Sequence, residues 1–282
     1  MASDPIAVVT GGSSGIGRAL ALELLRRGYR VAVVSRDPGR RKKIERELHD
    51  FAARLGQSAP PSCLALRADV RNYRELRSAA AEVEEKLGAV SLVVHAAGAA
   101  RPGYADQLPI RTYREQMELN FLGTVHAVRA FGAAMLDRGQ GSLVTFSSVA
   151  AFLPVFGFSA YAPAKAAVIA YAETIRQEYR HRGVRVHVVC PPDTQTPGLS
   201  RENEHKPYET MELSRGAGLL EPEEVARQVL RGVRRGRFLI VPGTPSKLLF
   251  SLSRHLPGLT RLLLDREIRK IRKGDPGKAT QP

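Results

Sequence analysis

A serine, a tyrosine and a lysine stand at spacings that suit acid-base chemistry on a carbonyl group. Tyr161 and Lys165 are four residues apart and so share one face of a helix, and Ser148 stands thirteen residues before Tyr161. A phenol has a pKa of about 10, and a neighbouring ammonium lowers that pKa because it favours the phenolate. Ser148 can donate a hydrogen bond to an oxygen that gains negative charge. Ser147 is the adjacent hydroxyl.

The glycine-rich segment 10–17, which reads TGGSSGIG, predicts a site for a phosphate-bearing ligand. It follows the apolar run 6–9 and precedes a helix-like stretch, so the free N–H groups of a helix start face the ligand. Gly11 allows a sharp turn at positive φ, Gly15 lets the backbone approach a pyrophosphate, and Gly17 lets helix and strand pack closely. Because the spacing differs from the ordinary Gly-x-Gly-x-x-Gly fingerprint, a tight structural turn is the alternative to a dinucleotide site.

The end of the second apolar run indicates which dinucleotide is bound. An enzyme that uses NAD often has an acid here, which accepts a hydrogen bond from the ribose 2′-hydroxyl. This chain has Ser35 and Arg36 instead, which suit a 2′-phosphate, and Arg40 and Arg41 add positive charge. We therefore expect NADPH as the cofactor, although residues 40–46 also fit a solvated helix start.

Together these motifs resemble the short-chain dehydrogenase/reductase family, and the resemblance runs from residue 6 to residue 241. It implies that Tyr161 gives or takes the proton, that Lys165 binds the nicotinamide ribose and tunes Tyr161, and that Ser148 orients the substrate. Asn120 matches the family's helix asparagine, which supports a proton-relay water near Lys165; its alternative role is to end a helix turn. Asp69 and Val70 resemble the adenine-contacting pair, although Asp69 also fits a helix cap. Further expected cofactor contacts are Ser13, Ser14, Ile16, Ala97, Gly98, Pro192 and Thr194.

The chain departs from the family pattern at two places. His95 stands where an asparagine is usual, and we expect it to be structural because no Ser-His-Asp arrangement surrounds it. Pro191-Pro192 replaces the usual Pro-Gly at the nicotinamide loop. The sequence that follows, with Glu202-Asn203 and the run 206–210, resembles the 3-ketodihydrosphingosine reductase branch, as does the run 156–161.

That branch implies NADPH-dependent reduction of a long-chain hydrophobic ketone, 3-ketosphinganine, to sphinganine. Two alternatives stay open. One is a reductase of another hydrophobic ketone, such as a steroid or a 3-oxoacyl compound. The other is a dinucleotide-sensing protein without turnover, against which the intact Ser148, Tyr161 and Lys165 argue.

The elements that must position these residues form an α/β pattern. Apolar runs of strand length alternate with stretches of helical periodicity such as 73–87 and 162–181, which predicts a single-domain, Rossmann-type, doubly wound parallel sheet of about seven strands. The segment 191–220 shows no clear apolar period and is expected to be an irregular lid. We expect a reductase domain over residues 1–242 and a C-terminal extension over 243–282. The strand-like runs are 6–10, 30–34, 63–66, 91–95, 143–146, 184–190 and 238–241.

Charge is concentrated in the extension. The chain carries a formal charge of +15, of which +10 lies in residues 231–282. Leucines recur at helical spacing among basic residues, and Pro257-Gly258 divides the segment into two predicted short helices. We expect this amphipathic extension to lie on an anionic membrane; the alternative is that the leucines cover the domain core or a subunit partner. No nucleic-acid-binding signature accompanies the charge. The leucines are Leu248, Leu252, Leu256, Leu259 and Leu263.

The cysteines and the apolar segments indicate where the protein is located in the cell. Cys63 and Cys190 lie in strand-like runs, which predicts buried thiols in a reducing compartment, and their spacing suggests no metal site. Nothing before Ile6 resembles a secretory signal, and no apolar run reaches the roughly 18 residues of a spanning helix. We expect a cytoplasmic protein, peripheral at the cytoplasmic membrane face, that forms a homo-oligomer. Residues 274–282 are expected to be disordered.

Overall fold

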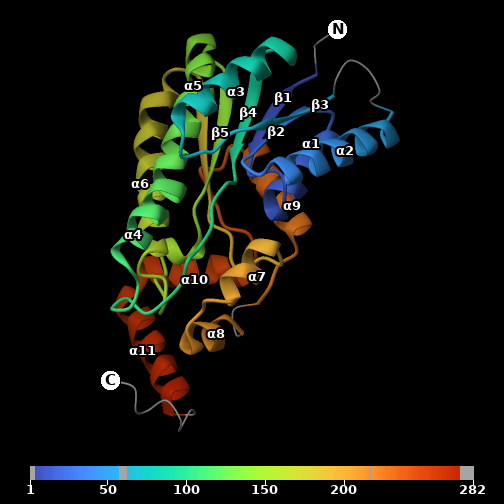
Figure 1. Ribbon diagram of the computed structural model, residues 1–282. Coiled ribbons are helices and arrows are strands. Elements are labelled where there is room, and N and C mark those ends of the chain that lie inside the picture. Colours follow the sequence, from blue (N-terminus) through green and yellow to red (C-terminus); the bar gives the residue numbers. More distant parts are fainter. Residues whose placement is uncertain (1–3, 57–61, 216–217, 274–282) are drawn as a thin grey trace.

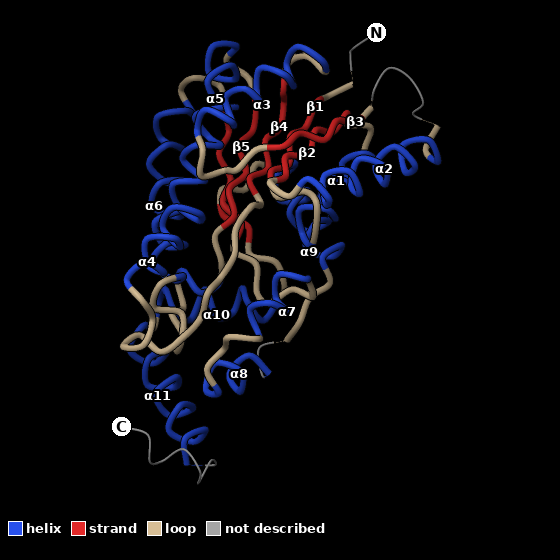
Figure 2. The backbone as a smooth tube through the Cα atoms, viewed as in Figure 1, coloured by secondary structure: helices blue, strands red, loops and turns tan. Residues whose placement is uncertain are grey.

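The computed structural model describes residues 4–56, 62–215 and 218–273 and contains one seven-stranded parallel sheet (Figures 1 and 2). The strand order is β3-β2-β1-β4-β5-β6-β7, and neighbouring strands pair in parallel throughout. This confirms the predicted fold class. The strands are β1 (Ile6–Thr10), β2 (Arg30–Ser35), β3 (Cys63–Arg67), β4 (Val90–His95), β5 (Gly141–Phe146), β6 (Val184–Val189) and β7 (Leu239–Ile240).

Helices cover both faces of the sheet, which explains why the strands are apolar on both sides. In β1, Ile6 and Val8 belong to one core cluster while Ala7 and Val9 belong to the other. Figure 1 shows one group of helices on each side of the strands. One side carries α3 (Tyr73–Lys86), α5 (Gly123–Arg138) and α6 (Tyr161–Arg180), and the other carries α1 (Gly15–Arg26), α2 (Pro38–Arg54) and α9 (Pro222–Arg234).

The predicted irregular lid is partly helical. It contains α7 (Pro197–Asn203) and α8 (Tyr208–Arg215), two short helices between β6 and α9. The prediction of an irregular segment was wrong here because α7 buries none of its residues and therefore shows no apolar stripe. Its N-terminus is fixed by a side chain instead, since the Thr196 hydroxyl accepts a hydrogen bond from the Leu199 amide.

The C-terminal extension forms two helices, as predicted. They are α10 (Thr244–His255) and α11 (Pro257–Lys273), and Pro257 stands at the first turn of α11, where its missing N–H costs nothing. Phe250 of α10 packs edge-on against Phe152, with ring centroids 5.0 Å apart. Figure 1 shows α11 running beside α8 at the end of the molecule that carries the lid. The predicted disorder concerns residues 274–282, which lie outside the residues that the structure describes.

A continuous helical run covers residues 110–138. It consists of α4 (Ile110–Gln116), the π-helical turn η1 (Met117–Leu122) and α5. Its length and composition would allow it to cross a membrane, but α5 packs against β4 and β5 in the core. We therefore interpret it as a core helix.

Both cysteines are buried and free, as expected. Burial raises the pKa of the Cys63 thiol to about 11 and that of Cys190 to about 12, so both remain protonated at neutral pH.

Candidate active site

A cavity of about 740 Å³ opens at the carboxyl ends of the strands, where ligands bind in doubly wound sheets. All the residues expected to contact the cofactor line it, and so do Ser148, Tyr161 and Lys165. Asn120 is buried and is not among the lining residues. The predicted cofactor residues in the lining are Gly11, Ser13, Ser14, Gly15, Ile16, Gly17, Ser35, Arg36, Arg40, Asp69, Val70, Ala97, Gly98, Tyr161, Lys165, Pro192 and Thr194.

The glycine turn between β1 and α1 has no room for larger residues. Gly11 has a φ of +70°, and a Cβ added to it would lie 2.7 Å from the Ala97 Cα. A Cβ on Gly17 would lie 2.4 Å from the Gly11 carbonyl oxygen. Gly15, with a φ of +54°, opens α1, so the first amides of that helix face the cavity. This backbone cradle fits the pyrophosphate of a dinucleotide.

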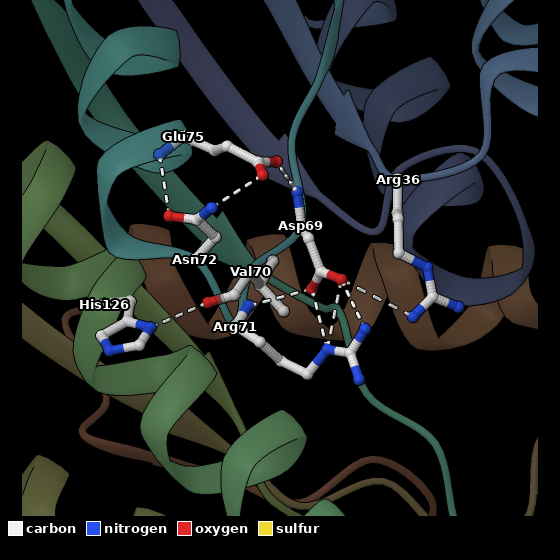
Figure 3. Close-up of polar contacts among 7 residues, drawn as sticks. All are labelled: Arg36, Asp69, Val70, Arg71, Asn72, Glu75 and His126. Carbon is white, nitrogen blue, oxygen red and sulfur yellow. Dashed lines mark hydrogen bonds and ion pairs between the residues drawn. The ribbon is translucent and has the colours of Figure 1, made fainter.

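Two arginines flank the Asp69 carboxylate, which lines the end of the cavity next to β2 and β3 (Figure 3). Arg71 binds the Asp69 carboxylate at 2.6 Å, and an Arg36 guanidinium nitrogen lies 3.8 Å from it on the other side. Both arginines, with Arg71 acting mainly through its hydrogen bond, keep the pKa of Asp69 below its usual range. Arg36 leaves 66% of its side chain exposed, which makes its guanidinium accessible to an anion.

Asp69 is not a helix cap. The cap of α3 is Asn72, whose side chain accepts from the Arg74 and Glu75 amides. Glu75 in turn accepts from the Asp69 amide at 2.8 Å, which fixes the loop that carries Asp69 (Figure 3). Arg40 lies at the start of α2 and 3.8 Å from Asp37, as the solvated helix start predicts.

Ser148, Tyr161 and Lys165 lie together in the cavity at the carboxyl ends of the strands. Ser148 follows β5, Tyr161 is the first residue of α6 and Lys165 lies one turn later. The Lys165 Nζ donates to the Phe146 carbonyl at 2.8 Å and lies 5.7 Å from the centre of the Tyr161 ring. Ser147 instead donates to the Lys165 carbonyl at 2.7 Å, so it fastens α6 to β5.

The pKa of Tyr161 differs from the expectation based on spacing. Burial raises the pKa of this phenol well above its ordinary value, the charges of Glu202 and Asp193 add to the rise, and a hydrogen bond to Ser148 opposes it. Burial also lowers the pKa of Lys165 to about 8. The expected lowering of the Tyr161 pKa was wrong for this structure, because desolvation of the phenol is the largest effect on this pKa and raises it.

Asn120 lies within the π-helical turn η1, a local distortion frequent at functional sites. Its Nδ2 donates to the Ala99 carbonyl at 3.0 Å and to the Gln116 side chain at 3.1 Å. A Cβ on Gly98 would lie 2.8 Å from the Asn120 Oδ1 and 3.1 Å from the Lys165 Nζ. Gly98 therefore lets the asparagine and the lysine approach the same point, although the relay role of Asn120 stays a prediction.

His95 is buried at the end of β4. Its Nδ1 lies 2.8 Å from the Thr10 hydroxyl, and burial lowers the pKa of the imidazole to about 3. The ring is therefore neutral at physiological pH, and it links β4 to β1 directly below the glycine turn.

The lid adds charged residues that the sequence analysis did not single out for a role. Lys206 is fully buried, and its Nζ lies 3.3 Å from an Asp193 carboxylate oxygen, 3.1 Å from a Glu202 oxygen and 3.3 Å from the Ser214 hydroxyl. We call these four residues the Lys206 cluster. Asp193, Glu202 and Ser214 also line the cavity.

A second polar contact joins the lid to the extension. Glu209 of α8 accepts from the Tyr104 hydroxyl at 3.0 Å and from the Arg272 Nε at 3.2 Å. The Arg272 guanidinium lies 5.7 Å above the Phe156 ring, which packs edge-on against Tyr104. These four residues form what we call the Glu209 clasp. Leu249 of α10 lines the cavity nearby, so the extension contributes to its wall.

Comparison with known proteins places these features in context. A model of the short chain dehydrogenase family matches residues 5–207. The 3-dehydrosphinganine reductase of Danio rerio is 34% identical over 247 residues, which cover 87% of this chain and 73% of that protein. The 3-ketodihydrosphingosine reductase of Bos taurus is 34% identical over 257 residues, covering 91% and 76%.

Solved structures share the fold. An actinorhodin polyketide ketoreductase with NADPH superposes with a TM-score of 0.76 at 25% identity, covering 86% of this chain and 95% of that one. A short chain dehydrogenase/reductase from Burkholderia phymatum in complex with NAD gives a TM-score of 0.77 at 22% identity, covering 93% and 95%. These two neighbours carry different dinucleotides.

Proposed function

The chain belongs to the short chain dehydrogenase family, and from that premise we propose that it is an NADPH-dependent reductase of 3-ketosphinganine. The observation that carries the proposal is the meeting of Ser148, Tyr161 and Lys165 in one cavity with a phenol that keeps its proton at neutral pH. A protonated phenol is the form that a reductase needs as its acid. Relatives named for this reaction in two vertebrates support the substrate.

The geometry of the cavity supports specific residues as the nucleotide contacts. The backbone at Gly11, Gly15 and Gly17 would hold the pyrophosphate, and Lys165 would bind the nicotinamide ribose. When bound, NADPH supplies a hydride for the carbonyl carbon of the substrate. Arg36 would hold the 2′-phosphate, because its exposed guanidinium can meet a phosphate with two parallel hydrogen bonds.

The protein's own residues supply the proton and the orientation. Tyr161 donates its Oη proton to the ketone oxygen, so that the carbonyl, with the hydride that NADPH would supply, becomes a secondary alcohol. The Lys165 ammonium beside the ring favours the phenolate that remains on Tyr161. Ser148 donates toward the ketone oxygen as charge develops. Lys165, held against the Phe146 carbonyl, presents its ammonium beside the ring of Tyr161. Apolar side chains at the lid end, among them Leu153, Phe158 and Leu249, line the cavity where an alkyl chain would lie.

A substrate panel tests this function. Purified protein receives NADPH with 3-ketosphinganine, a steroid ketone, a 3-oxoacyl thioester or a short cyclic ketone, and loss of reduced nicotinamide absorbance is followed. We expect the highest kcat/KM with 3-ketosphinganine. Preference for a steroid or 3-oxoacyl compound would favour the second reductase assignment. NADPH binding without turnover on any ketone would favour a dinucleotide sensor.

We also propose that α10 and α11 lie on an anionic membrane, which would deliver this lipid substrate. Four of the five periodic leucines are exposed, Leu248 to 68%, so these four do not cover the core of the chain. Basic side chains are interleaved with them, and each attracts an anionic headgroup by about 1 kcal/mol. The exposed basic residues of the two helices include Lys247, Arg254, Arg261, Arg266, Arg269 and Lys270.

Point substitutions test the membrane proposal better than truncation after Val241, which would also remove Leu249 from the cavity wall. Leu248→Ser combined with Leu263→Ser should weaken binding to vesicles that contain phosphatidylserine, and salt should weaken binding of the parent protein. Ile110→Ser is the matched control, because Ile110 is exposed outside these helices. If the leucines cover a subunit partner instead, the double variant has a different oligomeric mass in solution from that of the parent protein. The parent protein then does not bind the vesicles.

A further inference from the structure

The Lys206 cluster contains more negative than positive charge. The single ammonium of Lys206 faces two carboxylates, those of Asp193 and Glu202, at 3.3 and 3.1 Å. The Lys206 side chain is 1% exposed, while those of Glu202 and Asp193 are 16% and 32% exposed. The lysine is thus closed off within the protein, and the carboxylates keep access to the cavity that they line. One negative charge remains without a counter-charge inside this cluster.

This excess charge lies near the reacting atoms. Tyr161, Glu202 and Asp193 line the same cavity. The charges of both carboxylates act on the Tyr161 phenol, where they raise its pKa. Burial in turn raises the pKa of Glu202, so the site disfavours an uncompensated carboxylate. A cation that entered the cavity would relieve both effects.

We propose that Glu202, assisted by Asp193, binds a substrate ammonium group on the carbon next to the ketone. This inference rests on the proposed function, since 3-ketosphinganine carries an amino group at that carbon. The ammonium would form a charge-assisted hydrogen bond with Glu202 while the ketone oxygen faces Tyr161 and Ser148. The lid would then select 2-amino-3-ketones over plain ketones of the same length, because only the ammonium compensates the second carboxylate.

Paired substrates test the inference. The kcat/KM values of 3-ketosphinganine and of a 3-ketone with the same chain but no amino group are measured for the parent protein and Glu202→Gln. We expect the ratio of amine-bearing to amine-free kcat/KM to fall at least about tenfold in the variant, as loss of a charged hydrogen bond predicts. Glu212→Gln is the matched control: it removes the same charge from a lid carboxylate of α8 that is not part of the cavity lining, and it should keep the parent ratio.

A structural role of the cluster gives a different result. If Glu202 serves only to hold Lys206 and the lid, Glu202→Gln lowers both kcat/KM values by the same factor, and the inference is overturned. An equal fall of the ratio in Glu212→Gln would also overturn it, because the general field of the lid would then select the amine.

Binding supplies a readout that does not depend on turnover. Dodecylamine and dodecanol are compared as competitors of the amine-free ketone in the parent protein. We expect the amine to bind at least about tenfold more tightly, and Glu202→Gln to remove that preference. Equal binding of the two competitors contradicts the inference. Reduction of neither substrate by the parent protein contradicts the proposed function instead.

Discussion

The dinucleotide end and the lid end of the cavity are held together by different kinds of interaction. At the dinucleotide end, backbone atoms and short side chains meet at fixed distances, as where Gly17 leaves no space for a Cβ beside the Gly11 carbonyl. At the lid end, long charged side chains join segments far apart in sequence, as where Glu209 binds both Tyr104 and Arg272. Steric contacts fix one geometry, whereas an ion pair with an exposed partner, such as Arg272, can be exchanged at a small cost in stability. We therefore expect the first end to set whether a nucleotide binds and the second to set which ketone is reduced.

Tyr161 lies where the two ends meet, and its substitution should have the largest effect. Tyr161→Phe should lower kcat by about 10²–10⁴, because the variant has no phenolic proton to donate. NADPH affinity, measured by calorimetry, should stay close to that of the parent protein. Tyr171→Phe, on the same helix but facing Phe121, is the control that keeps turnover. Near-parental kcat in Tyr161→Phe would eliminate Tyr161 as the proton donor.

Adding one methyl group to a glycine should have different effects at the dinucleotide end and in the C-terminal extension. Gly17→Ala forces a Cβ against the Gly11 carbonyl and should cost about 1–3 kcal/mol of unfolding free energy, with weaker NADPH binding. Gly258→Ala, in the first turn of α11, adds the same methyl where nothing lies within 4 Å. It should leave denaturant unfolding and NADPH binding unchanged. Similar losses in both variants would remove the steric distinction.

Acid should destabilise the dinucleotide end through His95. The folded-state pKa is about 3, while the unfolded chain binds a proton below about pH 6.5, so stability falls as pH decreases through this window. The slope from this one group is about 1.4 kcal/mol per pH unit. His95→Asn should flatten the pH dependence of urea unfolding between pH 6.5 and pH 5, apart from other groups such as buried His187. His255→Asn, at an exposed position of α10, should not.

Cofactor choice should depend on one accessible side chain at the dinucleotide end. Arg36→Ala should weaken NADPH binding by about tenfold or more and NADH binding far less, since only NADPH has the 2′-phosphate. Arg46→Ala removes the same charge from an exposed position on α2 and serves as control. Equal losses for both nucleotides in Arg36→Ala would show that Arg36 contacts a group common to them.

The Glu209 clasp should give the smallest effect. Glu209→Gln keeps an acceptor for Tyr104 but removes the charge that binds Arg272, whose side chain is 63% exposed. We expect less than about 1 kcal/mol of global destabilisation. Faster hydrogen exchange in α8 and α11 would show the local loosening, with Glu212→Gln on α8 as control. If Glu209→Gln instead unfolds at a much lower denaturant concentration than the parent protein, the Glu209 clasp contributes to the stability of the core.

The sequence could predict the dinucleotide end because that end depends on local order along the chain. The apolar runs identified all seven strands, and a strand followed by TGGSSGIG placed the turn correctly. The four-residue spacing of Tyr161 and Lys165 predicted their common helix face. The raised pKa of Tyr161 could not be predicted, because it depends on burial that spacing does not encode.

The lid end was less predictable because its contacts have no signature in sequence. α7 buries no residue, so its helix shows no apolar period. Glu209 and Arg272 are separated by 63 positions, and only the folded chain brings them together. Lys206 could have been noticed as a lysine four residues after Glu202, the spacing of a helical ion pair, but its burial follows from the packing of the lid.

During synthesis, the strands of this sheet would emerge in an order that starts inside the sheet and moves toward its edges. β1 is followed by β2 and β3 on one side and then by β4 to β7 on the other, so each emerging strand meets an open edge and none inserts between two paired strands. The glycine turn leaves the ribosome first, and Arg272, at the end of α11, leaves much later. The nascent chain therefore acquires its nucleotide cradle well before the lid end of the cavity is closed.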